Sequence, residues 1–210
     1  MKTMTRLIYT TILTAGIIVT LSLLSKTPAK ADSQADNEAQ SEIQRGLDIS
    51  PVNLNLTGKN RSLVGLGSYI VNGQGACVDC HTCPSYVGKV ASDNPYANGG
   101  TLNQIDTPGP INSTNYMAGG VHFGPFVSAN LTPDPAKGNQ PEGLTFTEFL
   151  SVIQTGHDPD VPNHILQVMP WPVYRHMTLH DLSAIYEFLS SIPRATPGTC
   201  SGAGEFQIRP

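Results

Sequence analysis

The run Cys77-Val78-Asp79-Cys80-His81 constrains this 210-residue chain more than any other feature. Two cysteines separated by two residues and followed directly by histidine form the attachment signature of a c-type haem. In such a site the two thiols bond to one porphyrin and the histidine is the proximal ligand of the iron. Redox dithiols and half zinc sites share the cysteine spacing but do not need the histidine. We therefore predict one covalent haem c on Cys77 and Cys80, with His81 as the proximal iron ligand.

The N-terminus has the pattern of an export signal. Lys2 and Arg6 precede an apolar run from Leu7 to Leu24, and Ala29-Lys30-Ala31 offers a cleavage site of small residues. The pattern predicts a signal peptide over residues 1–31 and export to a periplasm or a compartment of the thylakoid-lumen type. The apolar run is close to the ~20 residues that span a bilayer, so an uncleaved membrane anchor is the alternative.

The charge balance bears on the partners. The chain holds 12 basic and 16 acidic side chains, and residues 1–31 hold four of the basic ones and none of the acidic ones. The remainder therefore has a net charge of −8. Such a surface repels nucleic acid and anionic lipid and favours a partner protein with a basic docking patch. Membrane association is expected only if the N-terminal segment stays attached.

Composition divides the rest of the chain into three parts. Residues 32–61 are polar and predict a flexible N-terminal segment. Residues 62–193 hold the periodic apolar segments and are expected to form one haem-binding domain, and residues 194–210 a C-terminal tail. The expected fold class is mainly α, with a long loop and a short β-hairpin.

Helix signals are clear within this domain. Apolar periodicity predicts helices over Leu63–Val71, Phe146–Thr155 and Leu179–Ser191. The last two begin with the capping boxes Thr145/Glu148 and Thr178/Asp181. Gly65 and Gly67 interrupt the first helix, as expected where another helix approaches closely. Short strands are predicted at residues 121–123 and 126–128.

The sixth iron ligand is expected to be a methionine. Met169 stands in Val168-Met169-Pro170-Trp171-Pro172, where the prolines hold the backbone extended and can keep a thioether directed at the iron. Met177 is the runner-up and Met117 the third choice, and each histidine besides His81 is a weaker candidate. These histidines are His122, His157, His164, His176 and His180.

Three further residues have predicted roles. Cys83 and Cys200 remain after haem attachment, and in an oxidising compartment a spare pair of cysteines favours a disulfide. Trp171, the one tryptophan, is a candidate donor to a haem propionate, with packing against the haem edge as the alternative.

Several motifs together resemble one family. They are Tyr69-Ile70-Val71, Ser128-Ala129-Asn130-Leu131-Thr132-Pro133-Asp134, Phe146-Thr147-Glu148-Phe149, Met169-Pro170-Trp171-Pro172-Val173-Tyr174 and Asp181-Leu182-Ser183-Ala184-Ile185-Tyr186-Glu187-Phe188-Leu189. With the haem motif they resemble a class I cytochrome c, and in particular the haem domains of cytochrome c subunits of bacterial membrane-bound alcohol and sugar-acid dehydrogenases. The resemblance covers about Ser62 to Pro193.

The resemblance implies a class I cytochrome c fold, with Met169 as the axial ligand and the first and last helices crossing beside the haem. It also implies that Asn130 lies near the haem edge as a candidate propionate contact. The chain departs from the family pattern in its single haem motif, in the pair Cys83/Cys200, and in lacking a clear C-terminal membrane helix.

The expected function is that of an exported monohaem cytochrome c that carries one electron at a time. The expected partner is a dehydrogenase, a terminal oxidase or another electron acceptor, with this chain as an electron-transfer protein or subunit rather than an enzyme. The alternatives are a peroxidase-like haem enzyme using His164, Arg175 and His176, and a haem-based redox or gas sensor with a labile distal ligand.

Overall fold

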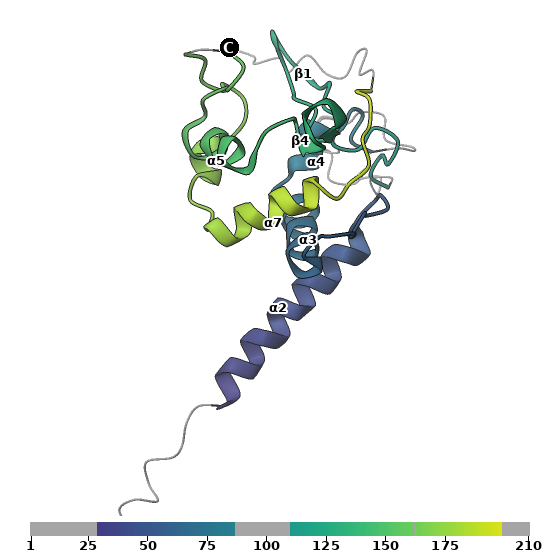
Figure 1. The fold of residues 1–210 in the computed structure, drawn as a ribbon, viewed down its shortest axis with the longest axis vertical. Helices are drawn as coiled ribbons and strands as arrows, with labels where there is room; N and C mark the ends of the chain where they lie inside the picture. Colours follow the sequence, from purple (N-terminus) through teal and green to yellow (C-terminus); the bar gives the residue numbers. More distant parts are fainter. Residues whose placement is uncertain (1–28, 87–109, 162, 199–210) are drawn as a thin grey trace, which may run out of the picture. The chain divides into compact units, whose positions relative to one another are not determined.

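A computed structural model describes residues 29–86, 110–161 and 163–198 of the chain (Figure 1). Residues 1–39 and 40–210 form separate compact units, and every contact described below lies in the second unit. The helices are α2 (Ala29–Ile49), α3 (Arg61–Tyr69), the π-helix η1 (Ile70–Gln74), α4 (Cys77–His81), the 3-10 helix η2 (Pro135–Lys137), α5 (Phe146–Thr155), α6 (Trp171–Tyr174) and α7 (Leu179–Leu189). Strand β1 (His122–Phe123) pairs antiparallel with β2 (Phe126–Val127), and β3 (Pro133–Asp134) pairs with β4 (Gln140–Pro141).

The observed elements agree with a mainly α fold that carries a short hairpin. Both capping boxes are present: Thr145 and Glu148 start α5, and Thr178 and Asp181 start α7. The hairpin β1–β2 lies within the two short strands predicted at residues 121–123 and 126–128. Helix α3 begins at Arg61, two residues before the predicted start at Leu63. The Asn60 side chain accepts from the Ser62 and Leu63 N–H groups and so caps the helix at this earlier position.

Helix α3 crosses α7 at very close range (Figure 1). A Cβ atom on Gly67 would lie 2.0 Å from the Ala184 carbonyl oxygen of α7, so no side chain fits at this position. Val64 of α3 and Leu182 and Phe188 of α7 are fully buried members of one core cluster. The prediction that a glycine in the first helix admits a neighbouring helix is confirmed, and the neighbour here is the last helix.

Residues 32–61 differ from the flexible segment predicted for them. Helix α2 runs to Ile49, and its last turns pack on α3. A Cβ on Gly46 would lie 1.9 Å from the Gly65 carbonyl oxygen, and the Ser68 hydroxyl donates to the Gly46 carbonyl at 2.6 Å. The polar composition did not predict this contact. The two helices meet where the backbones approach at Gly46 and Gly65, and such a contact needs no wide apolar face.

A buried chain of hydrogen bonds continues from this contact. The Tyr116 hydroxyl donates to Asn72 Oδ1 at 2.5 Å, and Asn72 Nδ2 donates to Ser68 Oγ at 3.1 Å. Ser68 in turn donates to Gly46. The loop at Tyr116 is thereby tied through η1 and α3 to α2, and each buried polar side chain in the series has a partner.

The predicted signal peptide lies almost wholly outside the described residues, so its cleavage and the alternative of a membrane anchor stay predictions. Within the part of the chain that the structure describes, no helix is both long enough and apolar enough to cross a bilayer.

Candidate functional site

The haem motif forms the short helix α4. The chain leaves η1 through a sharp turn, in which Ala76 takes a left-handed conformation at φ 51°. Cys77 and Cys80 lie three positions apart in this helix and therefore share one side of it. Both carry free thiols and are half-buried. The local fold thus presents two thiols together, at the spacing that two bonds to one porphyrin require.

The thiols are protonated at neutral pH. Burial raises the pKa of Cys77 to about 12, and repulsion by a charged Cys80 adds to the effect. Burial and the neighbouring Asp79 carboxylate also raise the pKa of Cys80. The surroundings of both thiols therefore favour the protonated form.

The His81 ring is held in one orientation and one tautomer. Its Nδ1 lies 2.9 Å from the Ala129 carbonyl oxygen, which can only accept a hydrogen bond, so Nδ1 carries the proton. Burial lowers the pKa of His81 and favours the neutral ring. A neutral imidazole with Nδ1 bound to a carbonyl leaves Nε2 available as a metal ligand. Two neighbouring thiols and such an imidazole are the donor set that a haem c needs.

The loop that holds the His81 ring also holds its backbone. Gly119 N–H donates to the His81 carbonyl at 2.8 Å, and Met117 N–H donates to Thr82 Oγ1 at 3.0 Å. Met117 is fully buried, with its sulfur 4.0 Å from the same hydroxyl. This methionine therefore packs against Thr82, the residue that follows His81.

The Met169 segment is anchored beside the thiols. Met169 is half-buried against the core, and α6 begins directly after it, with Pro170 as its N-cap. At the other end of α6, the Tyr174 hydroxyl donates to the Gly75 carbonyl at 2.6 Å. The Cys77 thiol contacts the same carbonyl oxygen at 3.7 Å. The contact between this segment and the haem motif is thus made by Tyr174, five residues after Met169.

The Tyr174 phenol is half-buried next to the haem motif. Burial is the largest of the effects that together raise the pKa of Tyr174 to about 12. Sequence reasoning did not single out Tyr174 as a site residue, although it closes the Met-Pro-Trp-Pro-Val-Tyr motif. Its role depends on a contact that spans 99 positions of the chain, which no local pattern contains.

Trp171 and Asn130 both have partners within the protein. The Trp171 indole N–H donates to the Leu166 carbonyl at 3.1 Å, and its ring lies so close to Gly156 that a Cβ there would be 2.3 Å away. Asn130 Nδ2 donates to the Ala195 carbonyl at 3.0 Å. The propionate contacts predicted for these two side chains stay predictions. Trp171 would have to exchange the partner of its one N–H, whereas the Asn130 amide has a second N–H.

The other predicted site residues lie as follows. Met177 is half-buried against the core just before the Thr178 cap of α7. Cys83 is fully buried, and its predicted partner Cys200 lies outside the described residues. His164 Nδ1 lies 3.2 Å from the Asp158 carboxylate, whereas Arg175 and His176 are exposed. The structure therefore gives these last three residues no shared polar contact that would support acid–base chemistry.

Comparison with known proteins confirms the predicted resemblance. Two similar proteins are the "Alcohol dehydrogenase (quinone), cytochrome c subunit" of Gluconacetobacter polyoxogenes and that of Komagataeibacter europaeus. Each is 29% identical to this chain over 127 residues, which are 60% of this chain and 21% of the relative. The chain thus matches about a fifth of the length of these curated relatives. No family model matches the chain, and no solved structure matches it.

Proposed function

We propose that this chain is an exported monohaem cytochrome c that carries one electron, with His81 and Met169 as the axial ligands of the iron. The observation that carries the proposal is the arrangement at α4. There, two half-buried thiols share one helix face, and the next side chain is a neutral imidazole whose Nδ1 is bound to the Ala129 carbonyl. The similarity to proteins named as cytochrome c subunits supports the same conclusion.

The bound haem would supply reversible one-electron chemistry at its iron. Cys77 and Cys80 would hold the porphyrin covalently, and His81 Nε2 would bind the iron. The hydrogen bond from Nδ1 to Ala129 fixes the ring orientation and increases the basicity of the ligand. Cys77 packs against the core cluster, which shields this part of the site from water.

The motif Met169-Pro170-Trp171-Pro172 and its resemblance to the family support Met169 as the distal ligand. The Tyr174 hydroxyl holds its segment at Gly75, two residues before Cys77. Met117, by contrast, packs on Thr82, the residue that follows the proximal histidine. Met177 remains the runner-up, because it also packs on the core and is joined to the end of α6 by its N–H bond to the Tyr174 carbonyl.

The redox partner that we propose is a dehydrogenase, with this chain as an electron-transfer component rather than as the catalytic subunit. The relatives are named as subunits of an alcohol dehydrogenase, which supports a partner of this class. A net charge of −8 beyond residue 31 favours docking on a basic surface.

Potentiometric titration of the purified, haem-loaded protein tests this function. We expect a single transition that follows a one-electron Nernst curve and is fully reversible, because one His/Met iron exchanges one electron. Steady peroxide turnover by the same protein, with loss of the distal ligand on reduction, would favour the peroxidase-like alternative instead.

We also propose the disulfide between Cys83 and Cys200. Gly198 packs so closely on Cys83 that a Cβ at this glycine would lie 1.7 Å from the Cys83 carbonyl oxygen. Two residues of chain span at most about 7 Å, which is long enough for a cysteine two positions after Gly198 to reach Cys83. Replacing Cys83 with serine is expected to lower the free energy of unfolding by about 2–4 kcal/mol, measured by denaturant titration. If peptide mapping of the unreduced protein finds both thiols available for alkylation, the pairing is wrong.

A further inference from the structure

The residues that follow α7 form a strap, Ala195–Gly198, that crosses the loop holding His81. Both backbone groups of Ala195 are bound by side chains of that loop. Ala195 N–H donates to Thr132 Oγ1 at 3.3 Å, and the Ala195 carbonyl accepts from Asn130 Nδ2 at 3.0 Å. Thr132 is only 2% exposed, so these bonds are largely shielded from water.

Asn130 and Thr132 also bind each other. Asn130 Oδ1 accepts from the Thr132 N–H at 2.9 Å and from the Thr132 hydroxyl at 2.6 Å. The two side chains and Ala195 therefore make a closed cluster, in which each side chain has its position fixed by two others. Replacing one member would leave a buried donor or acceptor without a partner.

The Asn130–Thr132 cluster begins at the residue next to Ala129, whose carbonyl is bound to His81. Ala129, whose carbonyl accepts from His81 Nδ1, directly precedes Asn130. A peptide unit is planar, so the Ala129 carbonyl and the Asn130 nitrogen rotate together as one body. Fixing the Asn130 side chain on the strap therefore restricts the direction in which the Ala129 carbonyl points.

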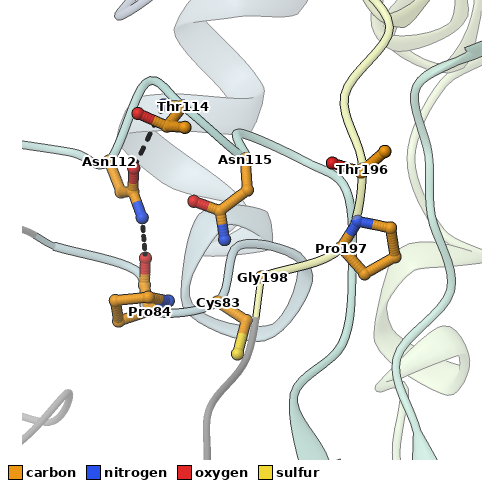
Figure 2. A pocket seen from close by; sticks show the side chains of 8 residues that line it. All are labelled: Cys83, Pro84, Asn112, Thr114, Asn115, Thr196, Pro197 and Gly198. Atoms are coloured by element: carbon orange, nitrogen blue, oxygen red, sulfur yellow. Dashed lines mark hydrogen bonds between the residues drawn. The ribbon is translucent and has the colours of Figure 1, made fainter.

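The far end of the strap packs on the segment that follows His81. Gly198 lies between the Cys83 carbonyl and the Asn115 amide, and a Cβ on it would be 2.0 Å from Asn115 Nδ2. Figure 2 shows the Asn115 side chain directed toward Gly198 and Cys83, at the edge of a pocket of about 390 Å³. A Cβ on Gly120 would meet the Gly198 carbonyl at 3.0 Å, so the loop and the strap touch along their length.

We infer that the C-terminal strap, through Asn130 and Thr132, positions the Ala129 carbonyl and thereby sets the strength of the hydrogen bond to the proximal His81. Asn130 and Thr132 are then positioning residues, and Asn130 acts through Ala195 rather than through a haem propionate. The inference rests on the proposed function, because its redox consequence requires His81 to bind the iron.

The expected consequence has a definite sign. A firm hydrogen bond from Nδ1 makes the imidazole more basic, and a more basic ligand stabilises the ferric iron relative to the ferrous iron. The strap therefore lowers the midpoint potential. Loosening it should weaken the bond, raise the potential and speed the exchange of the His81 ring proton with solvent.

The test compares four variants of the haem-loaded protein. Two variants disturb the cluster: Thr132→Val removes the hydroxyl while keeping the side-chain shape, and Asn130→Ala removes the hydrogen bond to Ala195. Two variants are controls: Thr132→Ser keeps the hydroxyl and loses only the methyl group, and Thr196→Val changes an exposed residue of the strap. Two quantities are measured in each: the midpoint potential, and the exchange rate of the His81 Nδ1 proton by NMR of the reduced protein with ¹⁵N-labelled histidine.

We expect a higher potential and severalfold faster exchange in Thr132→Val and Asn130→Ala, with wild-type values in Thr132→Ser and Thr196→Val. Unchanged potential and exchange in the first two variants, with haem retained, would overturn the inference and leave the proposed function intact. Equal shifts in Thr196→Val would overturn it as well. Absence of covalent haem from the wild-type protein would instead contradict the proposed function itself.

Discussion

Replacing both Cys77 and Cys80 with serine is expected to abolish covalent haem attachment. The two thiols lie on one face of α4 and are the free cysteines found within the described residues, so no other pair there could bond to the porphyrin. A serine hydroxyl does not replace a thiol in this chemistry. Haem-dependent peroxidase staining after denaturing electrophoresis measures the result, because only covalently bound haem stays on the chain.

Cys83→Ser is the matched control for this experiment. Cys83 lies only three positions after Cys80 but is fully buried beside Gly198, whereas Cys77 and Cys80 are half-buried. It should keep its haem and lose only stability. If the double variant still retains haem on the denatured chain, or if Cys83→Ser loses it, the assignment of the attachment residues is wrong.

Replacing Met169 with leucine is expected to remove the distal iron ligand while leaving the haem covalently bound. Leucine keeps the volume and the apolar contacts with the core but has no thioether. Because methionine ligation raises the potential of a haem iron, the midpoint potential should fall substantially. The weak near-infrared band that accompanies methionine–iron bonding in the oxidised state should vanish at the same time.

Met177→Leu is the control for the distal ligand, since Met177 is also half-buried against the core but precedes the cap of α7. It should keep both the band and the potential. A band that persists in Met169→Leu and disappears in Met177→Leu would transfer the ligand role to the runner-up.

Structural features that depend only on residues close together in the sequence could be predicted. The capping boxes at Thr145 and Thr178 need only a hydroxyl and a carboxylate three positions later, and both helices start where these residues indicate. The haem motif is similarly local, because one short helix brings both thiols and the imidazole together. The glycine at position 67 predicted a close helix approach, and the family resemblance implied that the last helix would be the neighbour.

Features that depend on distant contacts could not be predicted. Helix α2 has no wide apolar stripe, and it packs by backbone approach at Gly46, so polar composition suggested a flexible segment. The hydroxyl of Tyr174 and the carbonyl of Ala129 act over 99 and 48 positions of sequence, respectively. For Asn130, the family resemblance suggested a propionate, whereas the fold supplies a backbone carbonyl of the C-terminal strap.

The central claim is that Cys77, Cys80 and His81 form the attachment site of one haem. Mass spectrometry of the proteolytic peptide that contains residues 77–81, from protein exported by a host with haem-attachment machinery, tests it most directly. The account predicts a peptide heavier by one haem, with neither thiol open to alkylation. An unmodified peptide in which both thiols react with the alkylating agent would contradict it.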